Sequence, residues 1–197
     1  MDAIDCKNIS NHVLSFAFLF LKFWQSIAER NRDMTRENLD NVFLKMVEMY
    51  EGQPERIQHF TKVHSYAAYI GRQEKLDEKT MFILETAAYT HDIGIKKAEE
   101  LYHASNGRLQ QELGPGEAEI MLKELHFPED VIERVKYLIA HHHTYSDIQG
   151  IDLQILIEAD FLVNLYEHSD ESVASKVLEK IFKTASGTKL CKTMFRL

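Results

Sequence analysis

The sequence has few cysteines, few basic residues and no long apolar run, and each shortage argues against a class of protein. Only two cysteines, Cys6 and Cys191, occur in 197 residues, and they stand near opposite ends. They form neither a disulfide framework nor a closely spaced metal-binding pair, which favours a reducing compartment, the cytoplasm. Basic residues number 23 against 31 acidic ones, which gives a net charge of -8 with neutral histidines. A surface this acidic disfavours long nucleic acids, although a bound metal would still allow a small phosphorylated substrate.

The apolar run closest to a membrane span, Val13 to Trp24, is interrupted by Ser15 and Lys22. It is shorter than the roughly 18 to 20 residues that cross a bilayer, so we expect no transmembrane span. No basic segment precedes it, unlike a signal peptide. We interpret residues 1–33 as an N-terminal extension. Three structures remain open: a helix packed on the domain or on a second copy as a homodimer, a membrane-surface segment, or a segment peripheral to the fold.

No alternating run long enough for a strand, no internal repeat and no low-complexity linker is found in the chain. Apolar residues instead recur at helical spacing from residue 34 onward. The pattern therefore predicts an all-α class, with residues 34–197 as a single helical-bundle domain. Expected helices begin near Thr35, Pro54, Asp77, Pro115, Pro128, Leu153 and Val173.

Polar residues interrupt the apolar faces of several of these helices. In "ETAAYTHDIGIKKAEE" the pair His91-Asp92 ends an apolar run, and His64 and Asp160 fall on inward faces of two other helices. Alone, the pair could simply cap two helix ends. Several such residues in one small core each need a partner, and facing helices of a bundle are where metal sites are built.

The residue types indicate which ion would fit. Two imidazoles and two carboxylates suit a divalent transition metal such as Mn, Fe, Co, Ni or Zn. A structural zinc site would more often use thiolates, and no cysteine is near. Four protein ligands on an octahedral ion leave two positions for water and substrate, which is a catalytic arrangement.

Four motifs, "KVHSYAAYIGR", "AAYTHDIGIKK", "YLIAHHHTYS" and "ILIEADFLVNLYE", follow in this order. Over residues 35–183 this pattern resembles the HD-domain superfamily of metal-dependent phosphohydrolases. The resemblance implies a helical bundle with metal ligands His64, His91, Asp92 and Asp160. It implies hydrolysis of a phosphate ester in a small metabolite, most readily a nucleotide.

Three departures limit what the resemblance implies. Many two-metal relatives carry a further histidine before the helix expected near Pro115, where this chain has Gln110, Gln111 and Glu112, so we expect one ion and keep a second as an alternative. Relatives that hydrolyse guanosine tetraphosphate or act as 5'-nucleotidases place an acidic residue at the position of Ile95. The Gly-Tyr-Pro extension of cyclic-dinucleotide phosphodiesterases is missing after His143.

Further residues are candidates for substrate chemistry. Asp92 could orient or deprotonate a metal-bound water as well as ligate the ion. Lys96, which lies one turn beyond the His91-Asp92 pair (the HD pair), is a candidate phosphate contact, and so is Arg108. His142 and His143 are candidates for phosphate binding or proton transfer, because imidazole titrates near working pH. The alternative is one buried histidine with two incidental neighbours.

Two other functions remain open. A non-catalytic sensor would bind metal and nucleotide and bias a dimer through the N-terminal helix. An HD-type iron oxygenase would use two irons, against which the missing histidine near Gln111 argues.

Overall fold

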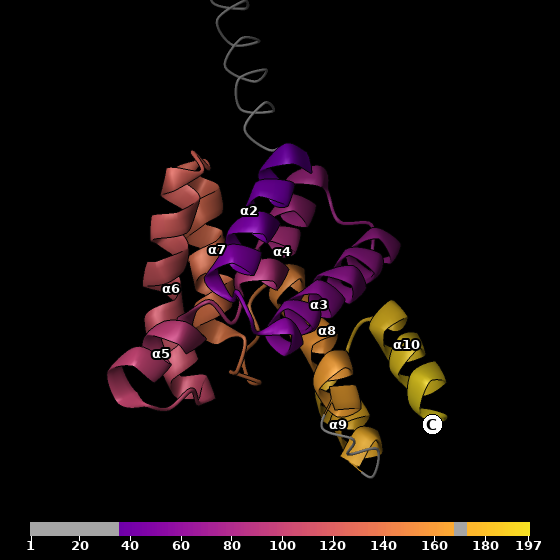
Figure 1. The fold of residues 1–197 in the computed structure, drawn as a ribbon. Helices are drawn as coiled ribbons and strands as arrows, with labels where there is room; N and C mark the ends of the chain where they lie inside the picture. The colour runs from indigo at the N-terminus through magenta and orange to yellow at the C-terminus, as the bar shows by residue number, and fades with distance from the viewer. Residues whose placement is uncertain (1–35, 168–172) are drawn as a thin grey trace, which may run out of the picture. The chain divides into compact units, whose positions relative to one another are not determined.

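The computed structural model describes residues 36–167 and 173–197, and every regular element within these ranges is helical (Figure 1). This confirms the predicted all-α class. The extension predicted for residues 1–33 lies outside the described residues. None of the described helices combines the length and apolar character needed to cross a membrane. The helices are α2 (Arg36–Met49), α3 (Pro54–Gln73), α4 (Glu78–Thr90), α5 (Gly94–Tyr102), α6 (Gly107–Glu124), α7 (Glu129–His141), α8 (Ile151–Glu167), α9 (Ala174–Ile181) and α10 (Ala185–Phe195).

Local signals account for several helix starts. Pro54 occupies the first turn of α3, where its missing N–H has no helical partner to lose. The Asp77 side chain caps α4 by accepting hydrogen bonds from the backbone N–H groups of Lys79 and Thr80. These two helices therefore begin where the sequence predicts.

The start of α6 differs from the prediction. The helix begins at Gly107, after the Asn106 side chain accepts a hydrogen bond from Leu109 N, and it runs through Pro115. The sequence favoured a loop up to Pro115 because an interior proline removes one helical hydrogen bond. The Asn106 cap starts this helix two turns earlier, so Gln110, Gln111 and Glu112 are helical residues. Helices α5 and α10 were also not anticipated.

Helix α8 lies at the centre of the core and packs against α3, α4, α7, α9 and α10 (Figure 1). Its central residues are almost all buried, which explains why it shows no polar face. Helix α3 also packs against α4, so α3, α4 and α8 meet in one region of the bundle. The residues that compose the candidate site come from α3, from α8 and from the turn that follows α4.

One buried carboxylate of α8 has a structural explanation. Glu158 Oε1 accepts hydrogen bonds from Gln154 Nε2 and from the backbone N–H groups of Lys183 and Thr184. Gly187 lies against the same carboxylate, where an added Cβ would come within 2.0 Å of Oε2. Glu158 therefore anchors the start of α10 on α8.

Candidate metal centre

The His91-Asp92 pair lies on a tight connection between two helices. His91 is the C-terminal cap of α4, and Gly94 already begins α5. The Tyr50 hydroxyl donates a hydrogen bond of 3.0 Å to the backbone carbonyl of Asp92, which anchors this turn to the segment after α2. Close packing continues at Gly94, where an added Cβ would lie 2.7 Å from the Gly114 nitrogen of α6.

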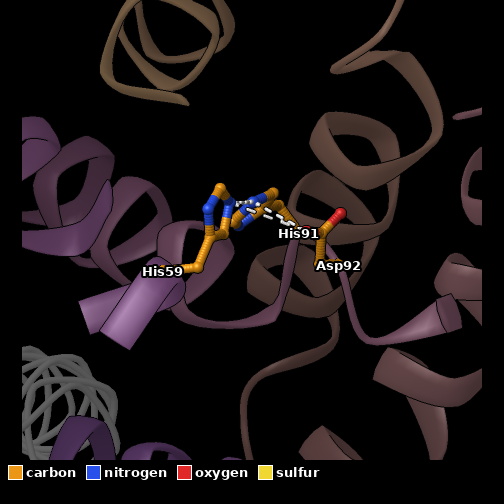
Figure 2. Close-up of side chains that lie close together, drawn as sticks. All are labelled: His59, His91 and Asp92. Carbon is orange, nitrogen blue, oxygen red and sulfur yellow. Dashed lines mark hydrogen bonds and ion pairs between the residues drawn. The ribbon is translucent and has the colours of Figure 1, made fainter. Parts of the chain in front are cut away.

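Four side chains converge beside this turn, and Figure 2 shows three of them, His59, His91 and Asp92. The Nε2 atoms of His59 and His91 lie 3.2 Å apart. Asp160 Oδ1 lies 3.2 Å from His59 Nε2 and 3.6 Å from His91 Nε2. Asp92 Oδ2 lies 3.6 Å and 3.5 Å from the same two nitrogens. The ring nitrogens of His59 and His91 thus lie between the carboxylates of Asp92 and Asp160.

The opposite ring nitrogens fix how the two imidazoles face the cluster. His91 Nδ1 lies 2.9 Å from the Ala88 carbonyl, and His59 Nδ1 lies 2.8 Å from Glu167 Oε2. Both partners are acceptors, so in a neutral imidazole each Nδ1 carries the proton and each Nε2 lone pair points into the cluster. The two lone pairs and two carboxylates then repel one another unless something positive lies between them.

The pKa values record the same crowding of negative charge. Burial alone lowers the pKa of His59, but its hydrogen bond to Asp160 and the charges of Asp160 and Asp92 raise it to about 9. Burial opposes protonation of His91 as well, yet Asp92 and Asp160 hold the pKa of His91 above its usual value. Burial raises the pKa of Asp92, but His91 and His142 together outweigh burial and lower the pKa to about 2. The site therefore favours positive charge at its centre.

A divalent metal fits this donor set. Ligand atoms about 2.1 Å from one ion lie roughly 3 to 3.4 Å apart, close to the separations between the cluster atoms. Two imidazole nitrogens and two carboxylate oxygens match the preferences of Zn, Mn, Fe, Co or Ni. His59, His91 and Asp92 each offer a ligand atom within 4.8 Å of the other two, and Asp160 faces the same two nitrogens.

The structure does not bring His64, predicted as the first ligand, to this cluster. His64 Nε2 lies 2.9 Å from Glu85 Oε2, and its ring stacks on Tyr89 with centroids 3.9 Å apart. His59, five residues earlier on the same helix, occupies the place expected for His64. We correct the proposed ligand set accordingly to His59, His91, Asp92 and Asp160.

His142 also faces the metal centre. It is buried, its Nδ1 lies 2.7 Å from the Ile139 carbonyl, and its Nε2 has no hydrogen-bond partner. Asp92 Oδ1 lies 3.7 Å from this Nε2, which is too long for a hydrogen bond. A buried polar atom without a partner is costly. His142 Nε2 is therefore available to an ion, a water or a substrate at this centre.

His143 is bonded differently from its neighbour. Its Nε2 contacts Gln110 Oε1 and its Nδ1 lies 3.3 Å from the Tyr145 hydroxyl, so both ring nitrogens have partners. Burial and the neighbouring His142 lower the pKa of His143 to about 4. His142, His143 and Asp92 still form a second group of possible metal ligands, because each offers a ligand atom within 4.8 Å of the other two.

The two predicted phosphate contacts, Lys96 and Arg108, lie apart from these side chains. Lys96 Nζ donates to the Met49 carbonyl and lines a groove whose lining includes none of the four cluster residues. Arg108 is mostly exposed and pairs with Glu112 one turn later.

Arg56, a cation that the sequence pattern did not indicate, lies closer to the metal centre. Arg56 lines a cavity of about 30 Å³ together with His59 and Asp92, and its Nη1 is buried without a hydrogen-bond partner. Its other terminal nitrogen, Nη2, donates to Glu99 at 2.6 Å.

The helical fold and the His-Asp centre define an HD-type domain. The profile of the HD domain family matches residues 56–171, which is more than half of the chain. The chain belongs to the HD-domain family, which confirms the resemblance drawn from the four sequence motifs.

A solved structure shares this fold. It is the crystal structure of a predicted HD superfamily hydrolase from an uncultured Thermotogales bacterium, at a TM-score of 0.58 and 23% identity. The alignment covers 82% of this chain and 85% of that chain. No curated protein matches the sequence.

Proposed function

We propose that this protein is a metal-dependent phosphohydrolase that cleaves a phosphate ester in a small metabolite, most readily a nucleotide. The observation that carries the proposal is the convergence of His59 of α3, Asp160 of α8, and His91 and Asp92 of the turn after α4. We assign catalysis to residues 34–197, with residues 1–33 outside the catalytic unit, because every residue of the centre follows Met34.

Each ligand would have a defined task. His59, His91, Asp92 and Asp160 would hold one divalent ion, which when bound lowers the pKa of a coordinated water and offsets phosphoryl charge. The Asp92 side chain is 21% exposed, unlike the buried His91 and Asp160, so its carboxylate can also accept a hydrogen bond from the attacking water. His142, whose Nε2 lacks a partner, would bind a phosphoryl oxygen or transfer a proton.

We propose Arg56 as a phosphate contact in preference to Lys96 and Arg108. Arg56 lines the cavity beside His59 and Asp92, and its Nη1 is buried without a hydrogen-bond partner. Guanidinium groups bind phosphate through paired N–H donors, and Glu99 occupies only Nη2.

Replacing Arg56 by methionine is expected to lower kcat/KM for phosphoester hydrolysis by about tenfold or more, because one charge-assisted contact to phosphate is lost. Bound metal should be unchanged. The matched control is Arg108→Met, which removes an exposed guanidinium that pairs only with Glu112. Steady-state kinetics of both variants would test this; equal losses in the two would contradict the assignment to Arg56.

The test of the function is a turnover screen on the full chain. Purified protein would be depleted of metal, reloaded with Mn, Co, Ni or Mg, and assayed for phosphate release from nucleotides and other phosphoesters. We expect metal-dependent release from at least one phosphoester class. Metal and nucleotide binding without turnover would favour a sensor module. An iron-specific spectrum with oxygen consumption would favour an oxygenase.

A further inference from the structure

Glu167, the last residue of α8, contacts a proposed metal ligand from outside the metal cluster. Its Oε2 lies 2.8 Å from His59 Nδ1, and its Oε1 accepts from Lys62 Nζ at 2.7 Å. The carboxylate is thus held by a cation of α3 while it faces an imidazole of the same helix.

Helix α8 holds this imidazole from both sides. Asp160 and Glu167 are seven residues apart, which is two helical turns, so they share one face of α8. Asp160 Oδ1 lies 3.2 Å from His59 Nε2, whereas Glu167 faces Nδ1 on the opposite edge of the ring. The ring plane and the proton position of His59 are therefore both set by α8.

We propose that Glu167 is a positioning residue for the metal centre, acting through His59. This inference depends on the metal site assigned above. A carboxylate that accepts a hydrogen bond from Nδ1–H of a metal-binding histidine fixes the tautomer of that imidazole. It also makes the Nε2 atom of the imidazole a stronger metal ligand. The proton on Nδ1 of His91 instead faces the neutral Ala88 carbonyl, as that of His142 faces the Ile139 carbonyl. Among these three histidines, His59 alone has a carboxylate partner on its outer nitrogen.

The competing explanation is a half-buried ion pair in which Glu167 merely joins Lys62 and His59. Partly exposed ion pairs of this kind contribute little to stability. The chain offers an internal comparison in His64, which is also on α3 but lies away from the cluster. Its Nε2 lies 2.9 Å from Oε2 of Glu85, a residue of α4. The two glutamate–histidine pairs have similar lengths and differ in whether the histidine faces the proposed ion.

The experiment compares Glu167→Gln and Glu167→Ala with Glu85→Gln in the full chain, using Co²⁺ as the probe. Dissociation constants would be measured by competition with a coloured chelator, and the visible spectrum of bound Co²⁺ would report ligand geometry. We expect about tenfold weaker binding for Glu167→Gln, up to about 100-fold for Glu167→Ala, and an altered spectrum in both. Glu85→Gln should bind Co²⁺ within about twofold of wild type.

The outcomes separate this inference from the proposed function. Wild-type affinity and spectrum in both Glu167 variants would overturn it, as would equal losses in Glu85→Gln. The near-isosteric Glu167→Gln decides the matter if Glu167→Ala does not fold. A wild-type chain that binds no Co²⁺ would overturn both proposals. Selective weakening in the Glu167 variants without phosphoester turnover would support the positioning role and reject the hydrolase.

Discussion

Replacing His59 by alanine is expected to weaken divalent-metal binding by at least about 100-fold, whereas His64→Ala should leave it nearly unchanged. Loss of an outer partner of a metal ligand typically costs 10- to 100-fold, so loss of a direct ligand should cost at least as much. His59 Nε2 contacts Asp160, Asp92 and His91, while His64 Nε2 faces only Glu85. Metal content after dialysis and Co²⁺ titration would measure the difference, and phosphate release should fall with metal occupancy.

A further variant calibrates this result. Asp92→Asn removes a carboxylate of the HD turn and should release metal as His59→Ala does. Helical circular dichroism should persist in each variant, since the buried apolar side chains of α4 and α8 are unchanged. Metal retained in His59→Ala but lost from His64→Ala would restore the ligand set predicted from the sequence.

The choice between these two histidines depends on tertiary contacts that periodicity does not contain. His64 continues an apolar series with Phe60 and Ala67, so it is a reasonable inward residue of α3. In the structure His59 turns toward Asp160 and Glu167 of α8, whereas His64 turns toward Glu85 of α4. Both are partly buried, and only their partners distinguish them.

One sequence signal could have separated the two histidines. Glu85 is a carboxylate within the apolar run of α4 and is nearly buried, so it needs a partner. Pairing Glu85 with His64 would have left His59 for the metal centre. The HD pair and Asp160 were easier to place, because each stands at the end or on the inner face of a strongly apolar helix.

The arrangement around Gln110 was harder to predict. The sequence pattern predicted a loop at Gln110 and Gln111, the positions at which the family resemblance would lead one to expect a histidine. In the folded chain the Asn106 cap brings Gln110 into the first turn of α6, where its side chain contacts His143. A helix cap and a partner 33 residues away decide this contact, and neither follows from hydrophobic spacing.

Replacing His142 by alanine is expected to lower phosphate release by about 10²-fold while metal content stays near one ion per chain. A transition-state contact or proton-transfer group of this kind typically contributes 10²-fold or more. His142 Nε2 is buried without a partner beside Asp92, which makes it available to substrate. The matched control is His141→Ala, because His141 bonds the Tyr137 carbonyl and stacks on that ring instead. His143→Ala should have a smaller effect, since both its nitrogens are already engaged.

The competing account is a second, weaker ion held by Asp92, His142 and His143, which form a geometrically acceptable group. Titration of Mn²⁺ with and without inorganic phosphate, in the wild type, His142→Ala and His143→Ala, would separate the two accounts. One equivalent under every condition, with turnover lost only in the His142 variant, would support a substrate role. A second equivalent that requires phosphate and disappears in both variants would contradict it. In that case Gln110 must release His143 Nε2 before the second ion binds, because the amide oxygen occupies that nitrogen in the structure.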